Sequence, residues 1–211
     1  MEEGKDLDLL SSELSDKKLS SLIENSWKSR FVGYPDTEDV NLATVPFTRF
    51  YREAPGRIKE YLSEKLKDKP LIDLGSGVAN ELTPKYFIKK FGISKYIGVD
   101  IENINLKTSI DGVPVEYIRR EALDFLSTYK GQANIMSNGF LCSELVSDKT
   151  EYGNIYNSRI FTQIKRILPQ DGIFFATHFD LNETAKKLGL KVENEIQPRD
   201  GYLWTFISFK K

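Results

Sequence analysis

The fold is decided by residues 70–80, which read PLIDLGSGVAN. The apolar run at 71–74 is typical of a short buried strand, and two glycines follow it directly, before a helical pattern of apolar residues at 81–91. Glycine allows the backbone to turn sharply from strand to helix while a ligand approaches closely. The segment therefore predicts a nucleotide-type pocket at the carboxyl end of this strand, with a tight turn that binds nothing as the simpler alternative.

Strand-like and helix-like segments alternate after this turn. Further strands are expected at 96–99, 115–118, 133–137 and 172–177, with helices at 122–129 and 154–168. Such alternation implies right-handed crossovers and a mostly parallel sheet that is covered on both faces. The last two strands, at 192–196 and 202–209, are separated by the tight segment PRDG at 198–201. Because this link is too short for a helical crossover, it predicts an antiparallel hairpin.

Residues 1–69 differ from the rest of the chain. Apolar residues recur at helical intervals within 1–30 and again at 50–66, where the pattern stops before Pro70. We expect an N-terminal helical extension at 1–69 and a ligand-binding domain at 70–211. Aromatic residues between Trp27 and Tyr51 are consistent with two roles of the extension, a lid over the ligand or ordinary core packing.

The overall composition excludes several classes of protein. Thirty Lys and Arg against 31 Asp and Glu leave a formal net charge of −1, so no global positive field favours general nucleic-acid binding. Cys142 is the only cysteine and His178 the only histidine, so we expect neither an intrachain disulfide nor a metal site. The N-terminus is acidic, and no apolar run approaches the roughly 20 residues that span a bilayer. These features favour a cytoplasmic protein with no membrane partner.

Two acids near the glycine turn indicate which ligand it takes. Asp73 lies two residues before the first glycine, where its carboxylate would repel a pyrophosphate and stabilise an ammonium group. Asp100 follows the second strand, where a carboxylate can accept both hydroxyls of a ribose. Asn80 stands where a dinucleotide fingerprint requires a third glycine. The set favours S-adenosylmethionine (SAM), which carries an ammonium beside its adenosine, over NAD; structural loop acids are the simpler alternative.

Residues 71–79 and the segment YIGVD at 96–100 resemble the first two motifs of class I SAM-dependent methyltransferases. The resemblance extends over residues 70–209 and includes REALD at 120–124, ANIMSNGFL at 133–141 and ILPQDGIFF at 167–175. Asn134 departs from the family, which often has an acid there. The resemblance implies a three-layer α/β, Rossmann-like fold. Its seven-stranded, mostly parallel sheet would have the order 3-2-1-4-5-7-6, with the last strand antiparallel.

The same resemblance implies the site and the reaction. SAM would be bound, and S-adenosylhomocysteine released, by Asp73, Gly75, Ser76, Gly77, Asp100, Ile101, Glu121, Ala122 and Asn138. Within this set Glu121 would accept the adenine amino group. The loop SNGF at 137–140 is not the Asn/Asp-Pro-Pro-Tyr sequence of enzymes that methylate nucleic-acid bases or glutamine, which favours a small-molecule acceptor.

The catalytic group is left open by the sequence, because transfer from a sulfonium by in-line displacement needs positioning more than a protein nucleophile. His178 follows the strand expected at 172–177 and is the candidate base, with a hydrogen-bonded loop histidine as the simpler alternative. Two other functions stay open: a non-catalytic SAM-binding partner subunit and an NAD-dependent oxidoreductase.

Overall fold

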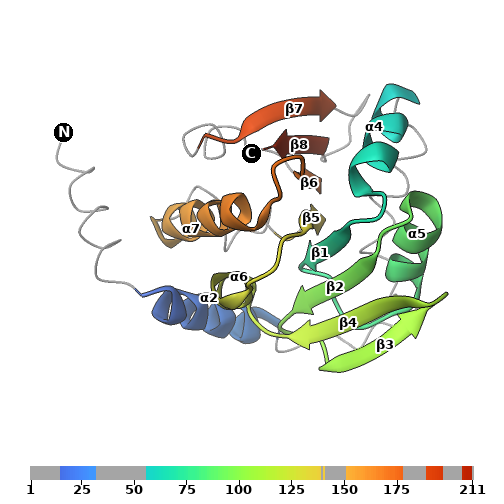
Figure 1. The fold of residues 1–211 in the computed structure, drawn as a ribbon. Helices are drawn as coiled ribbons and strands as arrows, with labels where there is room; N and C mark the ends of the chain where they lie inside the picture. Colours follow the sequence, from blue (N-terminus) through green and yellow to red (C-terminus); the bar gives the residue numbers. More distant parts are fainter. Residues whose placement is uncertain are drawn as a thin grey trace.

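The computed structural model describes residues 15–31, 56–138, 140, 151–177, 189–196 and 206–210 (Figure 1). The strands are β1 Pro70–Leu74, β2 Lys95–Asp100, β3 Leu106–Ile110, β4 Val113–Arg119, β5 Asn134–Asn138, β6 Ile173–Thr177, β7 Lys191–Ile196 and β8 Phe206–Lys210. The helices are α2 Asp16–Phe31, α4 Gly56–Leu66, α5 Leu82–Phe91, α6 Ala122–Thr128 and α7 Glu151–Ile167. All eight strands belong to one sheet, in the order β3-β4-β2-β1-β5-β6-β8-β7.

The middle of the sheet is parallel and its two edges are not. Strand β1 pairs in parallel with β2 and β5, β2 with β4, and β5 with β6. Strand β8 runs antiparallel to both β6 and β7, as the short link at 198–201 predicts. Because parallel strands end at the same edge, the ends of β1, β2, β4 and β5 meet on one side of the molecule.

The expected count of seven strands is wrong, and the expected order differs in detail. An additional strand, β3, forms the edge of the sheet and runs antiparallel to β4. Asp111 and Gly112 join the two strands with φ angles of 50° and 80°. Two positive φ angles are the requirement of a type I′ hairpin turn, for which Asp-Gly is a preferred sequence. The strand was missed because its residues are mostly exposed and carry no apolar alternation.

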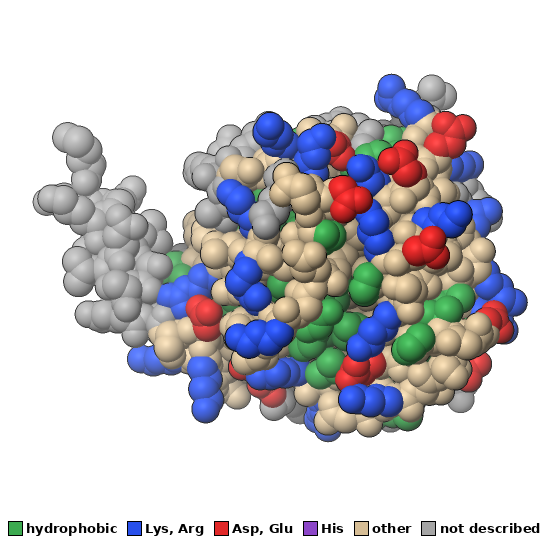
Figure 2. Space-filling view, viewed as in Figure 1, with side chains coloured by type: hydrophobic (Ala, Val, Ile, Leu, Met, Phe, Trp, Pro, Cys, Tyr) green, Lys and Arg blue, Asp and Glu red, His purple; other side chains and the backbone are tan. Residues whose placement is uncertain are grey.

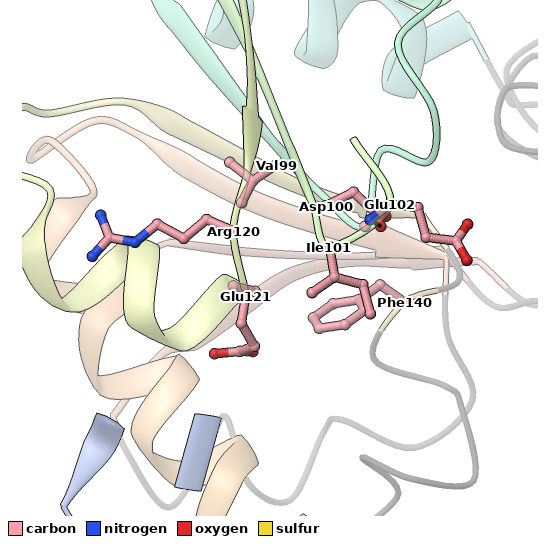
Figure 3. A pocket seen from close by; sticks show the side chains of 9 residues that line it. Val99, Asp100, Ile101, Glu102, Arg120, Glu121 and Phe140 are labelled. Carbon is pink, nitrogen blue, oxygen red and sulfur yellow. Dashed lines mark hydrogen bonds between the residues drawn. The ribbon is translucent and has the colours of Figure 1, made fainter. Parts of the chain in front are cut away.

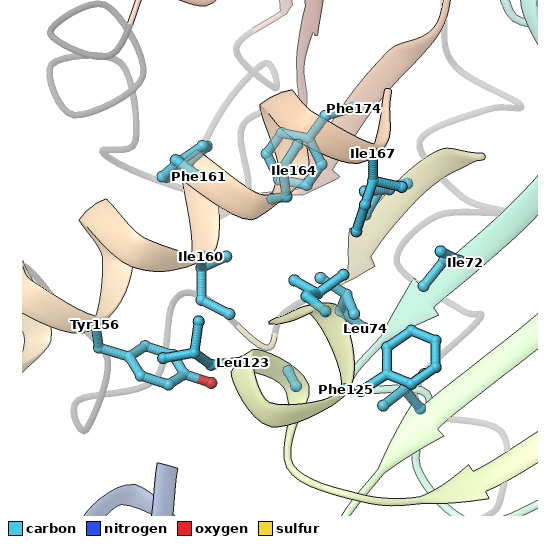
Figure 4. Close-up of a cluster of buried hydrophobic side chains, with 14 of the residues drawn as sticks. Ile72, Leu74, Leu123, Phe125, Tyr156, Ile160, Phe161, Ile164, Ile167 and Phe174 are labelled. Carbon is cyan, nitrogen blue, oxygen red and sulfur yellow. The ribbon is translucent and has the colours of Figure 1, made fainter. Parts of the chain in front are cut away.

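Two hydrophobic cores cover the two faces of the sheet. One contains α2, α6 and α7, where Tyr156, Ile160, Ile164 and Ile167 form the buried stripe of α7 (Figure 4). The spacing of three and four residues puts these side chains on one side of the helix. The other core contains α4 and α5, packed on the opposite face of β1, β2 and β4. The helices on both faces of the sheet hold the carboxyl ends of its central strands, where the candidate site lies.

The described part of the N-terminal extension packs on both faces. Leu19 and Ile23 of α2 are buried against α6 and α7, and the Arg159 guanidinium lies 2.7 Å from the Asp16 carboxylate. Ile58 and Leu62 of α4 belong to the opposite core. Among the described residues, no helix is long and apolar enough to cross a membrane.

Candidate functional site

The glycine turn after β1 needs its glycines. Gly75 and Gly77 have φ angles of 75° and 68°, a region that other residues rarely adopt. A Cβ atom on Gly75 would also lie 2.3 Å from the Cβ of Phe140, whereas one on Gly77 would meet nothing within 4 Å. Phe140, which follows β5, therefore packs directly over the first glycine.

Three side chains from distant segments hold the turn in place. The Gly77 amide donates to Oδ2 of Asp100 at 2.9 Å. The Asn80 amide donates to the Tyr117 hydroxyl oxygen at 3.3 Å, and that hydroxyl donates to the Asn80 carbonyl. The Asn103 side chain donates to the Ser76 hydroxyl at 3.1 Å. Tyr117 and Asn103 were not predicted, because no local pattern marks a contact between segments that are distant in the sequence.

An open cavity lies beside this turn, at the carboxyl ends of β2 and β4 (Figure 3). Its lining residues are Gly75, Val99, Asp100, Ile101, Glu102, Arg120, Glu121, Ala122 and Phe140. In the close-up, the Phe140 ring lies next to Ile101, and the Arg120 side chain points away from both. Hydrophobic side chains gather on the surface near these strand ends, as Figure 2 shows.

The cavity brings together five of the nine predicted cofactor residues: Gly75, Asp100, Ile101, Glu121 and Ala122. Ser76 and Gly77 belong to the turn but do not line the cavity. Asn138 ends β5, in register with Thr177, and its side chain lies outside the description. His178 also lies outside the described residues. Val99, Glu102, Arg120 and Phe140 were not predicted as lining residues, although each is within two residues of a predicted one.

Asp100 joins the turn to the cavity. Its Oδ2 accepts from the Gly77 amide, and its Oδ1 accepts from the Glu102 amide at 2.9 Å. Burial raises the pKa of Asp100, and these backbone donors oppose the rise. Each carboxylate oxygen can accept more than one hydrogen bond, so Asp100 can still receive ligand hydroxyls.

Glu121 forms the opposite part of the wall. It is the N-cap of α6, where its Oε2 accepts from the Asp124 amide at 3.1 Å. Its Oε1 accepts from the hydroxyl of Tyr156 on α7. Burial raises the pKa of Glu121, while hydrogen bonds from the Tyr156 hydroxyl and the Asp124 amide oppose the rise. The carboxylate is thus held in one orientation before any ligand arrives.

Asp73 lies behind the glycine turn and is not on the cavity wall. Only 3% of it is exposed, and its Oδ2 accepts from the Tyr96 hydroxyl at 2.6 Å. Its Oδ1 has no hydrogen-bond partner in the described part of the chain. Burial raises the pKa of Asp73 to about 7, although the Tyr96 hydrogen bond opposes the rise. The full negative charge that the sequence argument assumed is therefore only partly present at neutral pH.

Two asparagines have structural roles that the sequence left open. Oδ1 of Asn80 accepts from the Thr83 amide at 3.0 Å and so occupies a donor at the start of α5. A dinucleotide pyrophosphate needs such donors, so this capping disfavours NAD. Asn134 donates to the Lys65 carbonyl at 2.9 Å and accepts from the Ile173 amide at 2.8 Å. An amide can do both, whereas the acid common in the resembled family could only accept when ionised.

Comparison with known proteins finds similarity in structure alone. No family model matches the sequence, and no curated protein matches it. Magnesium protoporphyrin IX methyltransferase from Synechocystis, solved with bound SAM, is 11% identical with a TM-score of 0.53, covering 94% of this chain and 98% of that one. A predicted methyltransferase from Streptococcus mutans, in complex with S-adenosylhomocysteine, is 14% identical with a TM-score of 0.50, covering 72% and 93%.

An rRNA methylase from Streptococcus thermophilus is also similar, at 12% identity and a TM-score of 0.49, covering 74% and 94%. Among the described residues, no group of three or more His, Cys, Asp or Glu side chains could hold a metal ion. The sheet, the glycine turn and the two similar structures with TM-scores of 0.50 and above agree on the architecture. The chain therefore has the fold of the SAM-dependent methyltransferases.

Proposed function

We propose that the protein is a SAM-dependent methyltransferase that acts on a small-molecule acceptor. The observation that carries the proposal is the pairing of two carboxylates, the half-buried Asp100 and the buried Glu121, on the wall of one cavity beside a glycine turn. Asp100 ends β2 and Glu121 follows β4, and these two strands are adjacent and parallel. Carboxylates so placed suit a ligand that presents hydroxyls at one end and an amino group at the other.

The remaining wall fits an adenosine ligand. Asp100 would accept the ribose hydroxyls and Glu121 the adenine amino group, with Ile101, Ala122 and Phe140 against the base. Oδ1 of Asp73, which has no hydrogen-bond partner among the described residues, leaves an acceptor behind the turn, and its charge would favour the ligand's ammonium group. The fold neighbours solved with SAM and S-adenosylhomocysteine support the same ligand.

When bound, SAM would supply a methyl group activated by a sulfonium. The protein's own task is then to position the acceptor and to exclude water. Phe140 is placed for the second task, since it lines the cavity and packs over Gly75. His178 stays the proposed base for an acceptor that arrives protonated. The net charge of −1 and the SNGF loop support a small molecule over nucleic acid as the acceptor.

Titration calorimetry tests the ligand. We expect S-adenosylhomocysteine to bind and NAD not to bind. Asp100→Ala should lower the affinity for S-adenosylhomocysteine by about tenfold or more, because hydrogen bonds to a charged group contribute about 1.5–3 kcal/mol. Binding of NAD without S-adenosylhomocysteine would contradict the proposal.

A second measurement tests catalysis. The protein is incubated with SAM labelled on the methyl group and with panels of small molecules, RNA and protein. Label transfer to a small molecule supports the proposal, and transfer to RNA or protein alone contradicts the acceptor class. Binding without transfer to any panel would favour the non-catalytic partner subunit.

A further inference from the structure

Glu121 is one of two acids that face the cavity with a hydrogen bond at both oxygens, and the two sets of donors differ in kind. Both donors to Asp100 are backbone amides of neighbouring loops. Glu121 has one backbone donor, Asp124, and one side-chain donor, Tyr156, which comes from another helix. A side-chain donor can be replaced by mutation, so the orientation of Glu121 depends on the identity of residue 156.

We propose that Tyr156 is a positioning residue that fixes Glu121 as a hydrogen-bond acceptor and thereby makes the site select adenine over hypoxanthine. The inference rests on the proposed function. Its chemical basis is simple: an ionised carboxylate only accepts hydrogen bonds, the 6-amino group of adenine donates them, and the 6-oxo group of hypoxanthine accepts them. In its ionised form, a fixed Glu121 therefore attracts the first base and repels the second.

The position of Tyr156 suits this role. The residue is fully buried on α7, which packs against α6, so the hydroxyl has little freedom to leave Glu121. Its ring makes an edge contact with Phe140, another residue of the cavity wall, at a centroid distance of 6.5 Å. Tyr156 thus supports two lining residues without lining the cavity itself.

Loss of the hydroxyl should change what Glu121 can do. Burial raises the pKa of Glu121, and the Tyr156 hydroxyl is one of the groups that oppose the rise. Without it the carboxyl holds a proton more readily, and only the Asp124 amide still fixes the orientation of the group. A protonated carboxyl can donate to a 6-oxo group, so discrimination between the two bases should fall.

The test compares two ligands, S-adenosylhomocysteine and its deaminated analogue S-inosylhomocysteine, by calorimetry on the full chain. The wild type should prefer the first, and Tyr156→Phe should reduce the ratio of the two affinities at least fivefold. Tyr61→Phe is the matched control, because the Tyr61 hydroxyl also bonds a glutamate, Glu193, but between α4 and β7 and away from the cavity. This control should leave the ratio unchanged.

An unchanged ratio in a folded Tyr156→Phe protein would overturn the proposal while the proposed function stands. An equal fall in Tyr61→Phe would also overturn it, because the effect would then be general. If Tyr156→Phe does not fold, Glu121→Gln decides: the ratio must fall there, and an unchanged ratio overturns the proposal. A wild type that binds neither ligand overturns the proposed function itself.

Discussion

Asp73 and Glu121 are two buried acids near the same cavity, and each accepts a hydrogen bond from a tyrosine. They lie on opposite sides of the sheet: Tyr96, the partner of Asp73, is in the core under α5, and Tyr156, the partner of Glu121, is in the core under α6 and α7. Glu121 has a donor at each oxygen and lines the cavity. Asp73 has one donor, leaves Oδ1 without a partner in the described residues, and does not line it.

The difference shows how a protein can use buried charge in two ways. A buried carboxylate is stabilised only by the hydrogen bonds and charges that replace water. Glu121 has these contacts in advance, so it is a preformed acceptor. Asp73 has a donor at only one oxygen among the described residues, so its ionised form is unfavourable unless a positive group lies nearby.

The largest expected effect is on stability, at Asp73. A rise in its pKa from 3.8 to about 7 corresponds to roughly 4 kcal/mol of unfavourable ionisation in the folded state. Asp73→Asn removes the charge, keeps an oxygen for Tyr96, and should stabilise the protein by up to roughly this amount at pH 8. The folded state holds the extra proton between pH 4 and 7, so wild-type stability falls as pH rises through this range and is level above it.

Urea unfolding of both proteins at pH 8 and pH 4 measures this effect. The gain should be largest at pH 8 and small near pH 4, where folded Asp73 is protonated and the unfolded side chain is close to its ordinary pKa of 3.8. Asp171→Asn is the control, because Asp171 is an exposed aspartate paired with Lys69 and should show little change. Equal stability of Asp73→Asn and wild type at pH 8 would contradict the interpretation of Asp73 as a costly charge.

The two tyrosines provide the next comparison. Tyr96→Phe removes the one hydrogen bond of Asp73 and should cost about 3 kcal/mol at pH 8, the upper range for a bond to a charged group. Tyr156→Phe should cost about half as much, because Glu121 keeps the Asp124 amide. Urea unfolding of both variants measures the two losses of stability. Equal losses would show that the Asp124 amide does not compensate Glu121 for the missing hydroxyl.

Much of this site could be predicted from the sequence, for a physical reason. Parallel strands bring their carboxyl ends together, so polar residues at or just beyond these ends, such as Asp100 and Glu121, share one edge of the sheet whatever the conformation of the loops. The positive φ angles of Gly75 and Gly77 follow from the same strand-to-helix turn. The missed hairpin did have a local signal, Asp111-Gly112, which the weak pattern of β3 concealed.

The rest could not be predicted, because it depends on contacts between distant segments. Tyr117 bonds to a turn 37 residues earlier, and Tyr156 to an acid 35 residues earlier. Neither pair has a spacing that a helix or strand would reveal. The protonation of Asp73 depends on how deeply it is buried, which the sequence around it does not state. The same residue was predicted as a fully charged ammonium partner.

A smaller effect is expected on binding. If the charge of Asp73 acts on the ligand's ammonium from behind the turn, Asp73→Asn should lower the affinity for S-adenosylhomocysteine about tenfold at pH 8, which corresponds to about 1.4 kcal/mol. Calorimetry at pH 8 measures it, with circular dichroism to check the fold. A dinucleotide site would respond in the opposite sense, with NAD affinity unchanged or improved. Unchanged affinity for S-adenosylhomocysteine would mean that Asp73 is only a structural acid.

The smallest expected effect is the pH dependence of this affinity. With a pKa of about 7, Asp73 is mostly ionised at pH 8 and mostly protonated at pH 6. If the ionised form binds about tenfold better, the wild-type affinity should fall about fivefold between these two values, because a minority of ionised protein remains at pH 6. Asp73→Asn should lose this dependence, since its side chain does not titrate. A fall that persists in the variant would assign the titration to another acid of the wall, such as Glu102, whose pKa is also raised by burial. The variant therefore separates a charge behind the turn from the charges that face the cavity.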